Sequence, residues 1–308
     1  MADPDGPMTA SSTPAGGRLD AVPPEALILT AALSVQCGAG LATSLLREFG
    51  PLPVVAMRIV FGAVLLLAFR PIRLRGATRL ALGSCVALGV ILAVMNSVFY
   101  VALSRIPLGV AVTIEFWGPL TVAVLGSRRW LDLGWVVLAA AGIYTLAGGR
   151  LQADDALGVV AVFIAGFCWA LYIVVGRRVA YYWPDGRGLT LAMVVAGILV
   201  MPVTLTLSDA RPLLAAPLAL FGGLVVALFS SAIPYTMEIA ALRRLRAATF
   251  GVLMSLEPAI AALVGFVILG QVLHVTDLVA IGCVALASAG ASLTARRLPV
   301  AAGELESE

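Results

Sequence analysis

Three glutamates lie inside long apolar stretches of this sequence, where an ionised side chain is costly. They are Glu115, Glu238 and Glu257. At the centre of a bilayer an ionised carboxylate costs about 3 kcal/mol even on lenient insertion scales. Burial favours the neutral form of a carboxyl group, so such a residue can exchange a proton for the ammonium group of a ligand. This chemistry suits a carrier that couples its substrate to protons.

Each glutamate also has a structural interpretation. Glu115 could be a structural carboxylate held by one arginine, and Glu257 could reach a backbone amide or an arginine at a helix kink. Glu238 lies close to the cytoplasmic end of its predicted span, where Arg243 or Arg244 could pair with it. The residues alone leave these alternatives open.

A proline lies close to each of the three carboxylates. These prolines are Pro119, Pro234 and Pro258. Proline has no backbone N–H, so the carbonyl four residues earlier loses its usual helical partner, and for Pro119 that carbonyl belongs to Glu115. At membrane depth a freed carbonyl is tolerated where protein buries it or where it lines a water-filled cavity. We therefore predict helix breaks at the three prolines.

Arg58 lies inside the second apolar stretch, about 8 Å from its outer end at 1.5 Å per helical residue. Glu115 is at a comparable depth, so the two side chains could pair. The guanidinium could instead hold a substrate carboxylate through its fork of donors. It could also extend to the outer membrane surface, as arginines near helix ends do.

Other polar or aromatic side chains within the apolar stretches are candidates for a cavity lining. They are Gln36, Asn96, Tyr100, Tyr235 and Trp117. Hydrogen bonds between helices are the commoner use of such polar groups in membranes, and packing is the commoner use of a buried tryptophan. Binding and packing both remain open for this set.

No pattern in the sequence indicates an enzyme, a metal site or a nucleic-acid-binding protein. A phosphate-binding loop and a nucleophile–base motif are absent, and the paired Asp154 and Asp155 lack a third ligand. The net charge of +3 is small, and the arginines form short clusters between apolar runs. We expect no cofactor, with the proton gradient as driving force, a small-molecule substrate and a lipid bilayer around the protein. The oligomeric state is not indicated.

Membrane-spanning helices must position these side chains. Hydrophobic residues make up 61% of the chain and charged residues 12%, which is about half the charged share of a soluble protein. Ten apolar stretches have lengths suited to crossing a bilayer or packing within one. They are Ala26–Leu46, Pro53–Phe69, Ala77–Val101, Pro107–Leu125, Leu131–Gly148, Ala156–Val175, Gly188–Leu207, Leu213–Ala240, Ala247–Leu269 and Val275–Ala295. The predicted fold class is an all-α integral membrane protein with ten transmembrane helices.

Most loop arginines fall on one side if the amino terminus is cytoplasmic. The outer loops then hold only Arg47, Arg105, Arg150 and Arg211. The positive-inside rule therefore places both termini in the cytoplasm. Residues 1–25 contain much Pro, Gly and Ser and no apolar core of a signal peptide, so we predict a disordered cytoplasmic tail there. Residues 296–308 form a second predicted cytoplasmic tail.

The span from 26 to 148 is repeated weakly over 156–295. At one fixed offset Pro119 aligns with Pro258, and the run ALSRI that begins at Ala102 aligns with ALRRL from Ala241. Five helices per repeat is an odd number, so the two repeats have opposite orientations in the membrane. Inverted repeats are typical of secondary transporters with a central site between the halves. The glutamates do not follow the repeat, because Glu257 aligns with a glycine.

Several long segments make the chain resemble the EamA family of the drug/metabolite transporter superfamily, most closely its bacterial threonine/homoserine exporters. The segments are VVAMRIVFGAVLLLAFRPIRLR, NSVFYVALSRIPLGVAVTIEFWGPLTVAVLGSRR, FCWALYIVVGRR and SSAIPYTMEIAALRRLRAATFGVLMSLEPAIAALVGFVILGQVL. The resemblance runs from about residue 27 to residue 295. It implies ten helices, a central cavity and efflux driven by the proton gradient, and it leaves the solute open.

We therefore predict a bacterial inner-membrane exporter of small amino acids that works by proton antiport and alternating access. In this prediction Glu115 and Glu257 alternate between a proton and the substrate ammonium. An exporter of other metabolites, drugs or dyes is the alternative within transport. A passive channel or a non-transporting scaffold is the alternative from another class.

Overall fold

The computed structural model describes residues 22–74, 76–125, 130–150, 155–183, 185–209, 211–242 and 253–294. Every regular element in these ranges is a helix. Six of the helices are long and apolar enough to cross a membrane, and shorter apolar helices accompany them. The predicted class of an all-helical, multi-pass membrane protein is confirmed. Most of the first predicted tail, all of the second and the loop arginines Arg243 and Arg244 lie outside the described residues.

The first part of the chain forms long helices with one interruption. The helices are α1 (Pro24–Phe49), α2 (Pro51–Phe69), α3 (Arg79–Leu103), α4 (Leu108–Glu115), α5 (Trp117–Leu125) and α6 (Trp130–Arg150). Prolines occupy the first turns of α1 and α2, where their missing N–H would have no helical partner in any case. The fourth predicted span is divided between α4 and α5.

The second part of the chain contains more interruptions than the apolar pattern predicts. Its elements are α7 (Ala156–Tyr182), α8 (Arg187–Leu207), α9 (Arg211–Leu214), α10 (Pro217–Ala227), the π-helical turn η3 (Leu228–Ala232), α11 (Ile233–Leu242), α13 (Glu257–Leu269) and α14 (Val275–Thr294). We expected one helix from Leu213, but α10 begins only at Pro217. The residue before a proline avoids the helical conformation, and Ala216 is accordingly extended.

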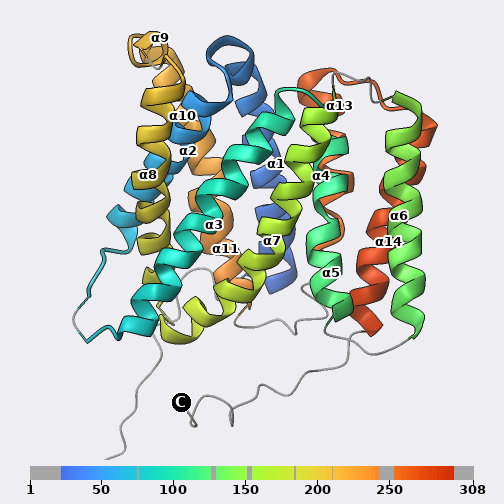
Figure 1. Cartoon of the computed structure of the whole chain (residues 1–308), viewed down its shortest axis with the longest axis horizontal. Coiled ribbons are helices and arrows are strands. Elements are labelled where there is room, and N and C mark those ends of the chain that lie inside the picture. Colours follow the sequence, from blue (N-terminus) through green and yellow to red (C-terminus); the bar gives the residue numbers. More distant parts are fainter. Residues whose placement is uncertain are drawn as a thin grey trace, which may run out of the picture.

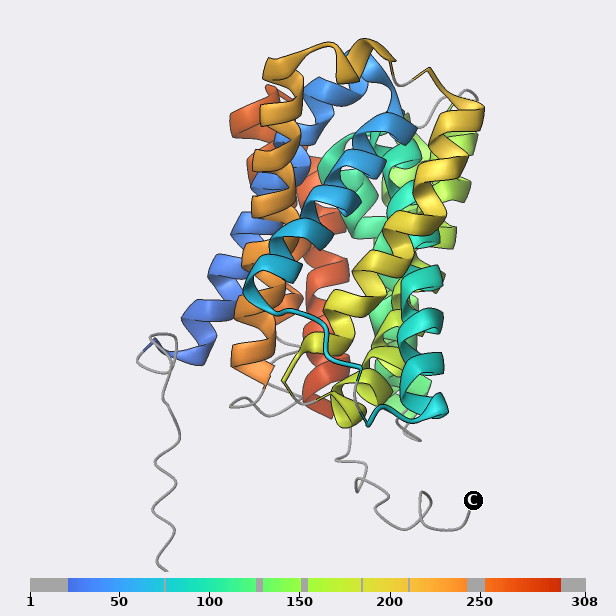
Figure 2. The same cartoon turned by 90° about the vertical axis from the view of Figure 1, so that its left-hand side faces the viewer.

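The helices stand side by side in one bundle (Figures 1 and 2). In Figure 1, α6 and α14 form a pair at one end of the bundle and α8, α9 and α10 lie at the other. The elements α1, α3, α4, α7 and α11 occupy the middle. The start of α1 and the end of α14 lie at the same face, at the bottom of both views.

The contacts between helices come in corresponding sets. The contact of α3 with α7 corresponds to the contact of α11 with α1. The contact of α3 with α8 corresponds to the contact of α10 with α2. Helices α4 and α5 pack on α7 as α13 packs on α1. Two further pairs, α2 with α8 and α6 with α14, join the two parts of the chain directly. Several contacts made by the helices of α1–α6 therefore have counterparts among the helices of α7–α14.

Candidate functional site

Glu115 is the last residue of α4, immediately before a break in the helix. Helix α5 begins at Trp117, and Pro119 in its first turn cannot donate to the carbonyl of Glu115. The side chain of Glu115 is buried, at 8% exposure. Phe116 is the residue between the two helices, and its ring meets the ring of Trp169 edge to face, with centroids 4.9 Å apart.

Helix α7 covers this break through a glycine. A Cβ atom added at Gly166 would lie 2.7 Å from the carbonyl oxygen of Glu115 and would also meet the indole of Trp117. A Cβ atom at Gly118 would collide with the carbonyl of Gly166. The absence of side chains at these two glycines is what allows α7 to approach the backbone at Glu115.

We expect Gly166→Ala to destabilise the protein by about 1–3 kcal/mol, because an added methyl group forces the backbone to shift. Gly176→Ala is the matched control on the same helix, since a Cβ atom there meets nothing within 4 Å. The control should be neutral or slightly stabilising, because alanine favours a helix over glycine. Thermal unfolding in detergent, followed by circular dichroism, measures the difference. Equal thermal stability of the two variants would contradict the close approach of α7 to the backbone at Glu115.

Glu257 lies at a second break. It is the first residue of α13, it is 4% exposed, and the turn before it contains Ser255 and Leu256. Pro258 occupies the first turn of α13, where proline is tolerated. The turn begins three residues before Pro258, just as the α4–α5 break lies three residues before Pro119. The aligned prolines thus accompany equivalent breaks in the two parts of the chain.

Glu238 is partly buried on α11, one helical turn after Pro234. Pro234 follows the π-helical turn η3 and cannot donate to the carbonyls of that turn. Side chains from two other helices donate to these carbonyls instead. The hydroxyl of Ser34 donates to the carbonyl of Phe229 at 2.6 Å, and Nη2 of Arg58 donates to the carbonyl of Ser230 at 2.9 Å.

The structure brings the three carboxylates and Arg58 into one electrostatic cluster. Glu257 interacts with both Glu115 and Glu238. Arg58 interacts with Glu115, and Tyr235 lies within range of both Arg58 and Glu238. Four different helices, α2, α4, α11 and α13, thus contribute to the cluster, from both parts of the chain.

Arg58 is buried, at 8% exposure, which excludes the extension to the membrane surface considered above. No ion pair within 4 Å joins it to Glu115 in the described residues, so its interaction with that carboxylate is of longer range. Its guanidinium lies over the ring of Tyr100, 5.4 Å from the centroid. The direct partner of Arg58 is a backbone carbonyl on η3, which the sequence did not indicate.

The remaining predicted residues have mixed placements. Asn96 is buried and its amide nitrogen donates to the carbonyl of Leu92 in its own helix at 2.8 Å. Gln36 is buried inside α1. The indole of Trp117 donates to the carbonyl of Phe163 at 3.2 Å, so it joins α5 to α7. Asn96 and Trp117 thus direct their side-chain N–H groups to helix backbone.

Sequence reasoning missed Tyr172 on α7. Its hydroxyl is within electrostatic range of Glu238 and Tyr235. The signal was present, since Tyr172 is a polar aromatic residue within an apolar stretch, as Tyr100 is. Cys168, one turn earlier on α7, lies within range of Glu115. Among the described residues no group of three His, Cys, Asp or Glu side chains could hold a metal ion.

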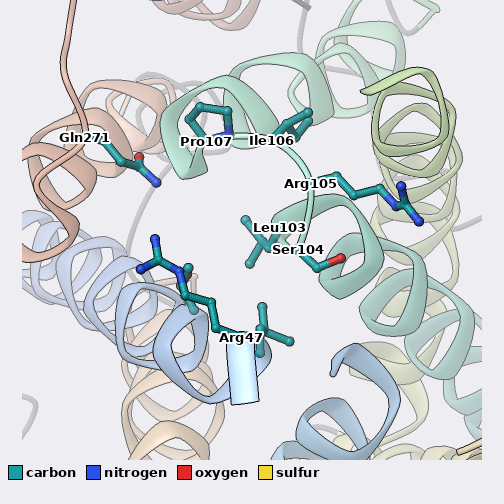
Figure 3. Close-up of a pocket in the computed structure, with 9 residues that line it drawn as sticks. Arg47, Leu103, Ser104, Arg105, Ile106, Pro107 and Gln271 are labelled. Atoms are coloured by element: carbon teal, nitrogen blue, oxygen red, sulfur yellow. The ribbon is translucent and has the colours of Figure 1, made fainter. Parts of the chain in front are cut away.

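A pocket of about 240 Å³ lies at the carboxyl-terminal ends of α1 and α3. These helix ends are at the top of Figure 1. Figure 3 shows Arg47 directed toward Gln271, and Arg105 directed away from the pocket. Close packing lies between this pocket and the carboxylates. A Cβ atom at Gly109 of α4 would be 2.9 Å from the Cα atom of Ala262 in α13. At this level the two parts of the chain are therefore in backbone contact.

Comparisons with known proteins identify the family of this chain. The EamA-like transporter family matches residues 156–293. The threonine/homoserine exporter RhtA of Escherichia coli K12 is 39% identical over 285 residues, which cover 89% of this chain and 92% of the exporter. RhtA of Salmonella typhimurium LT2 is 39% identical over 287 residues, covering 90% and 93%.

A solved crystal structure shares the fold with a TM-score of 0.63 at 18% identity, and the match covers 89% of this chain and 99% of that chain. The similarity to the exporters extends over nearly the whole length of this chain and of the exporters. This chain belongs to the EamA family of the drug/metabolite transporter superfamily.

Proposed function

We propose that this protein exports small amino acids of the threonine/homoserine type across a bacterial inner membrane in exchange for protons. It is a transporter rather than an enzyme. The identity to RhtA exporters supports the substrate class. The observation that carries the mechanism is the composition of the buried cluster, which contains three carboxylates and one arginine.

The charge of the cluster requires exchangeable cations. If Glu115, Glu238 and Glu257 were all ionised, Arg58 would neutralise only one of them. Uncompensated charge is strongly unfavourable at membrane depth. Protons can neutralise the remaining carboxylates in one state, and a substrate ammonium can replace a proton in another. Binding and proton release are then coupled because both depend on the same carboxylates.

Alternating access follows from the proposed repeat. We infer ten membrane spans in two inverted repeats, at residues 26–148 and 156–295, with both termini cytoplasmic. The corresponding contacts of α1–α6 and α7–α14 support this arrangement, as do the equivalent breaks near Pro119 and Pro258. In inverted-repeat transporters the halves rock around a site near the midplane. The cluster takes residues from both proposed halves, so such a movement would expose it to each side in turn.

Transport by the purified protein in proteoliposomes tests this function. With an imposed pH gradient we expect radiolabelled threonine or homoserine to move against its concentration gradient, and a protonophore should abolish this accumulation. A passive channel would only equilibrate the amino acid, and a scaffold would not move it. Either of these results would exclude the proposed antiport.

An organic cation is the second candidate substrate. Tyr100, Tyr172 and Tyr235 lie in or beside the cluster, and aromatic rings next to carboxylates attract cations. Dye efflux measured in the same proteoliposomes distinguishes the two substrate classes. Dye transport without amino-acid transport would favour this candidate.

A further inference from the structure

Two buried hydrogen-bond donors in the cluster have no acceptor in the part of the chain that the structure describes. They are Nε of Arg58 and the hydroxyl of Tyr100, and each is shielded from solvent without a hydrogen-bond partner among the described residues. The two groups are neighbours, because the guanidinium lies 5.4 Å from the centroid of the Tyr100 ring. The hydroxyl is close to Arg58 and Ser230 but lacks hydrogen-bond geometry with either. Unpaired buried donors are rare in folded proteins and call for an explanation.

A hydrogen bond from Nη2 fixes the orientation of the Arg58 guanidinium. Nη2 donates to the carbonyl of Ser230 in η3. Pro234 has no N–H that could donate to the carbonyls of this turn. The turn is held from α1 as well, because Ser34 bonds to Phe229 and a Cβ atom at Gly38 would lie 2.8 Å from Cβ of Ser230. The guanidinium is thus anchored at one nitrogen, while Nε stays available for a ligand.

We propose that Arg58 and Tyr100 bind the carboxylate of the transported amino acid. This inference rests on the proposed function. An α-carboxylate has two acceptor oxygens, so it can receive one hydrogen bond from Nε of Arg58 and one from the hydroxyl of Tyr100. Glu115 is within electrostatic range of Arg58 and would receive the substrate ammonium. The cation and the anion of a zwitterionic substrate are recognised by groups of opposite charge.

Substitution of tyrosine by phenylalanine separates this role from a structural one. Tyr100→Phe removes only a hydroxyl that has no hydrogen-bond partner within the described ranges, so a structural role predicts unchanged or higher thermal stability and unchanged transport. A role in carboxylate binding predicts a rise of about tenfold in the KM for threonine, the effect of losing one hydrogen bond to a charged group. Tyr144→Phe, at an exposed tyrosine on α6, is the matched control.

Competition with threoninol, in which an alcohol replaces the carboxylate, identifies the group that is recognised. Against the wild-type protein we expect threoninol to inhibit threonine transport at least about tenfold more weakly than unlabelled threonine does. In Tyr100→Phe this preference should shrink, and in Arg58→Lys, which loses Nε, it should shrink further.

An unchanged KM and an unchanged preference in Tyr100→Phe would overturn the carboxylate site, whether or not Arg58→Lys folds. Thermal unfolding of each variant shows that the protein is intact. Failure of the wild-type protein to transport threonine or homoserine would instead contradict the proposed function. The two failures are therefore distinguishable in one set of proteoliposomes.

Discussion

Glu257→Gln is expected to abolish proton-driven export while the protein stays folded. Glu257 interacts with both of the other carboxylates in the cluster, and its side chain is buried at the start of α13. Glutamine has nearly the same shape but can neither release a proton nor neutralise an ammonium group. The lost charge-assisted hydrogen bond alone corresponds to a tenfold to hundredfold loss of affinity, at about 1.5–3 kcal/mol.

The measurement is threonine accumulation in proteoliposomes under imposed pH gradients of increasing size. Wild-type accumulation should increase with the gradient, whereas accumulation by Glu257→Gln should stay at background throughout. Glu115→Gln is expected to behave similarly. Glu48→Gln, at an exposed glutamate near the end of α1, should resemble the wild type. Wild-type pH dependence in both Glu257→Gln and Glu115→Gln would rule out these residues as proton carriers.

A disulfide between residues 109 and 262 is expected to stop transport until it is reduced. A Cβ atom at Gly109 would lie 3.1 Å from Cβ of Ala262, across the contact between α4 and α13. Disulfides need a Cβ–Cβ distance of about 3.5–4.5 Å, so a small adjustment suffices. Gly109 is about 9 Å along α4 from Glu115, at 1.5 Å per residue. The bond would therefore hold the halves together between the cluster and the pocket at Arg47.

The experiment uses Gly109→Cys with Ala262→Cys in a background without the native cysteines. The four native cysteines, all free, are Cys37, Cys85, Cys168 and Cys283. Under oxidising conditions export should fall to background, and dithiothreitol should restore it. The two single variants should be insensitive to oxidation. Full activity of the cross-linked protein would show that this contact does not open during transport.

The sequence alone supported the class of the protein and the location of its helix breaks. Apolar stretches of membrane length can only be helices when they cross lipid, because each backbone group must find its partner within the helix. The positions of the helix breaks near Pro119 and Pro258 follow from the missing N–H of proline. The carboxylates were recognisable as functional candidates because ionised groups are expensive at that depth.

Which faces of the helices meet could not be predicted in the same way. A helix that is apolar on all sides carries no stripe that distinguishes its interior face from its lipid face. The hydrogen bond from Arg58 to the carbonyl of Ser230 joins residues far apart in the chain, and no local sequence pattern predicts it. The role of Gly166 likewise depends on the approach of α7 to the backbone at Glu115.

The amino-acid sequence by itself thus determined an all-helical membrane protein with costly carboxylates beside its helix breaks. These properties depend on local chemistry, namely hydropathy, proline geometry and charge. Only the tertiary structure decided that Glu115, Glu238 and Glu257 share a cluster with Arg58, and that Arg58 is anchored on η3. The physical reason is that helices in lipid associate through close packing and hydrogen bonds rather than through a hydrophobic pattern.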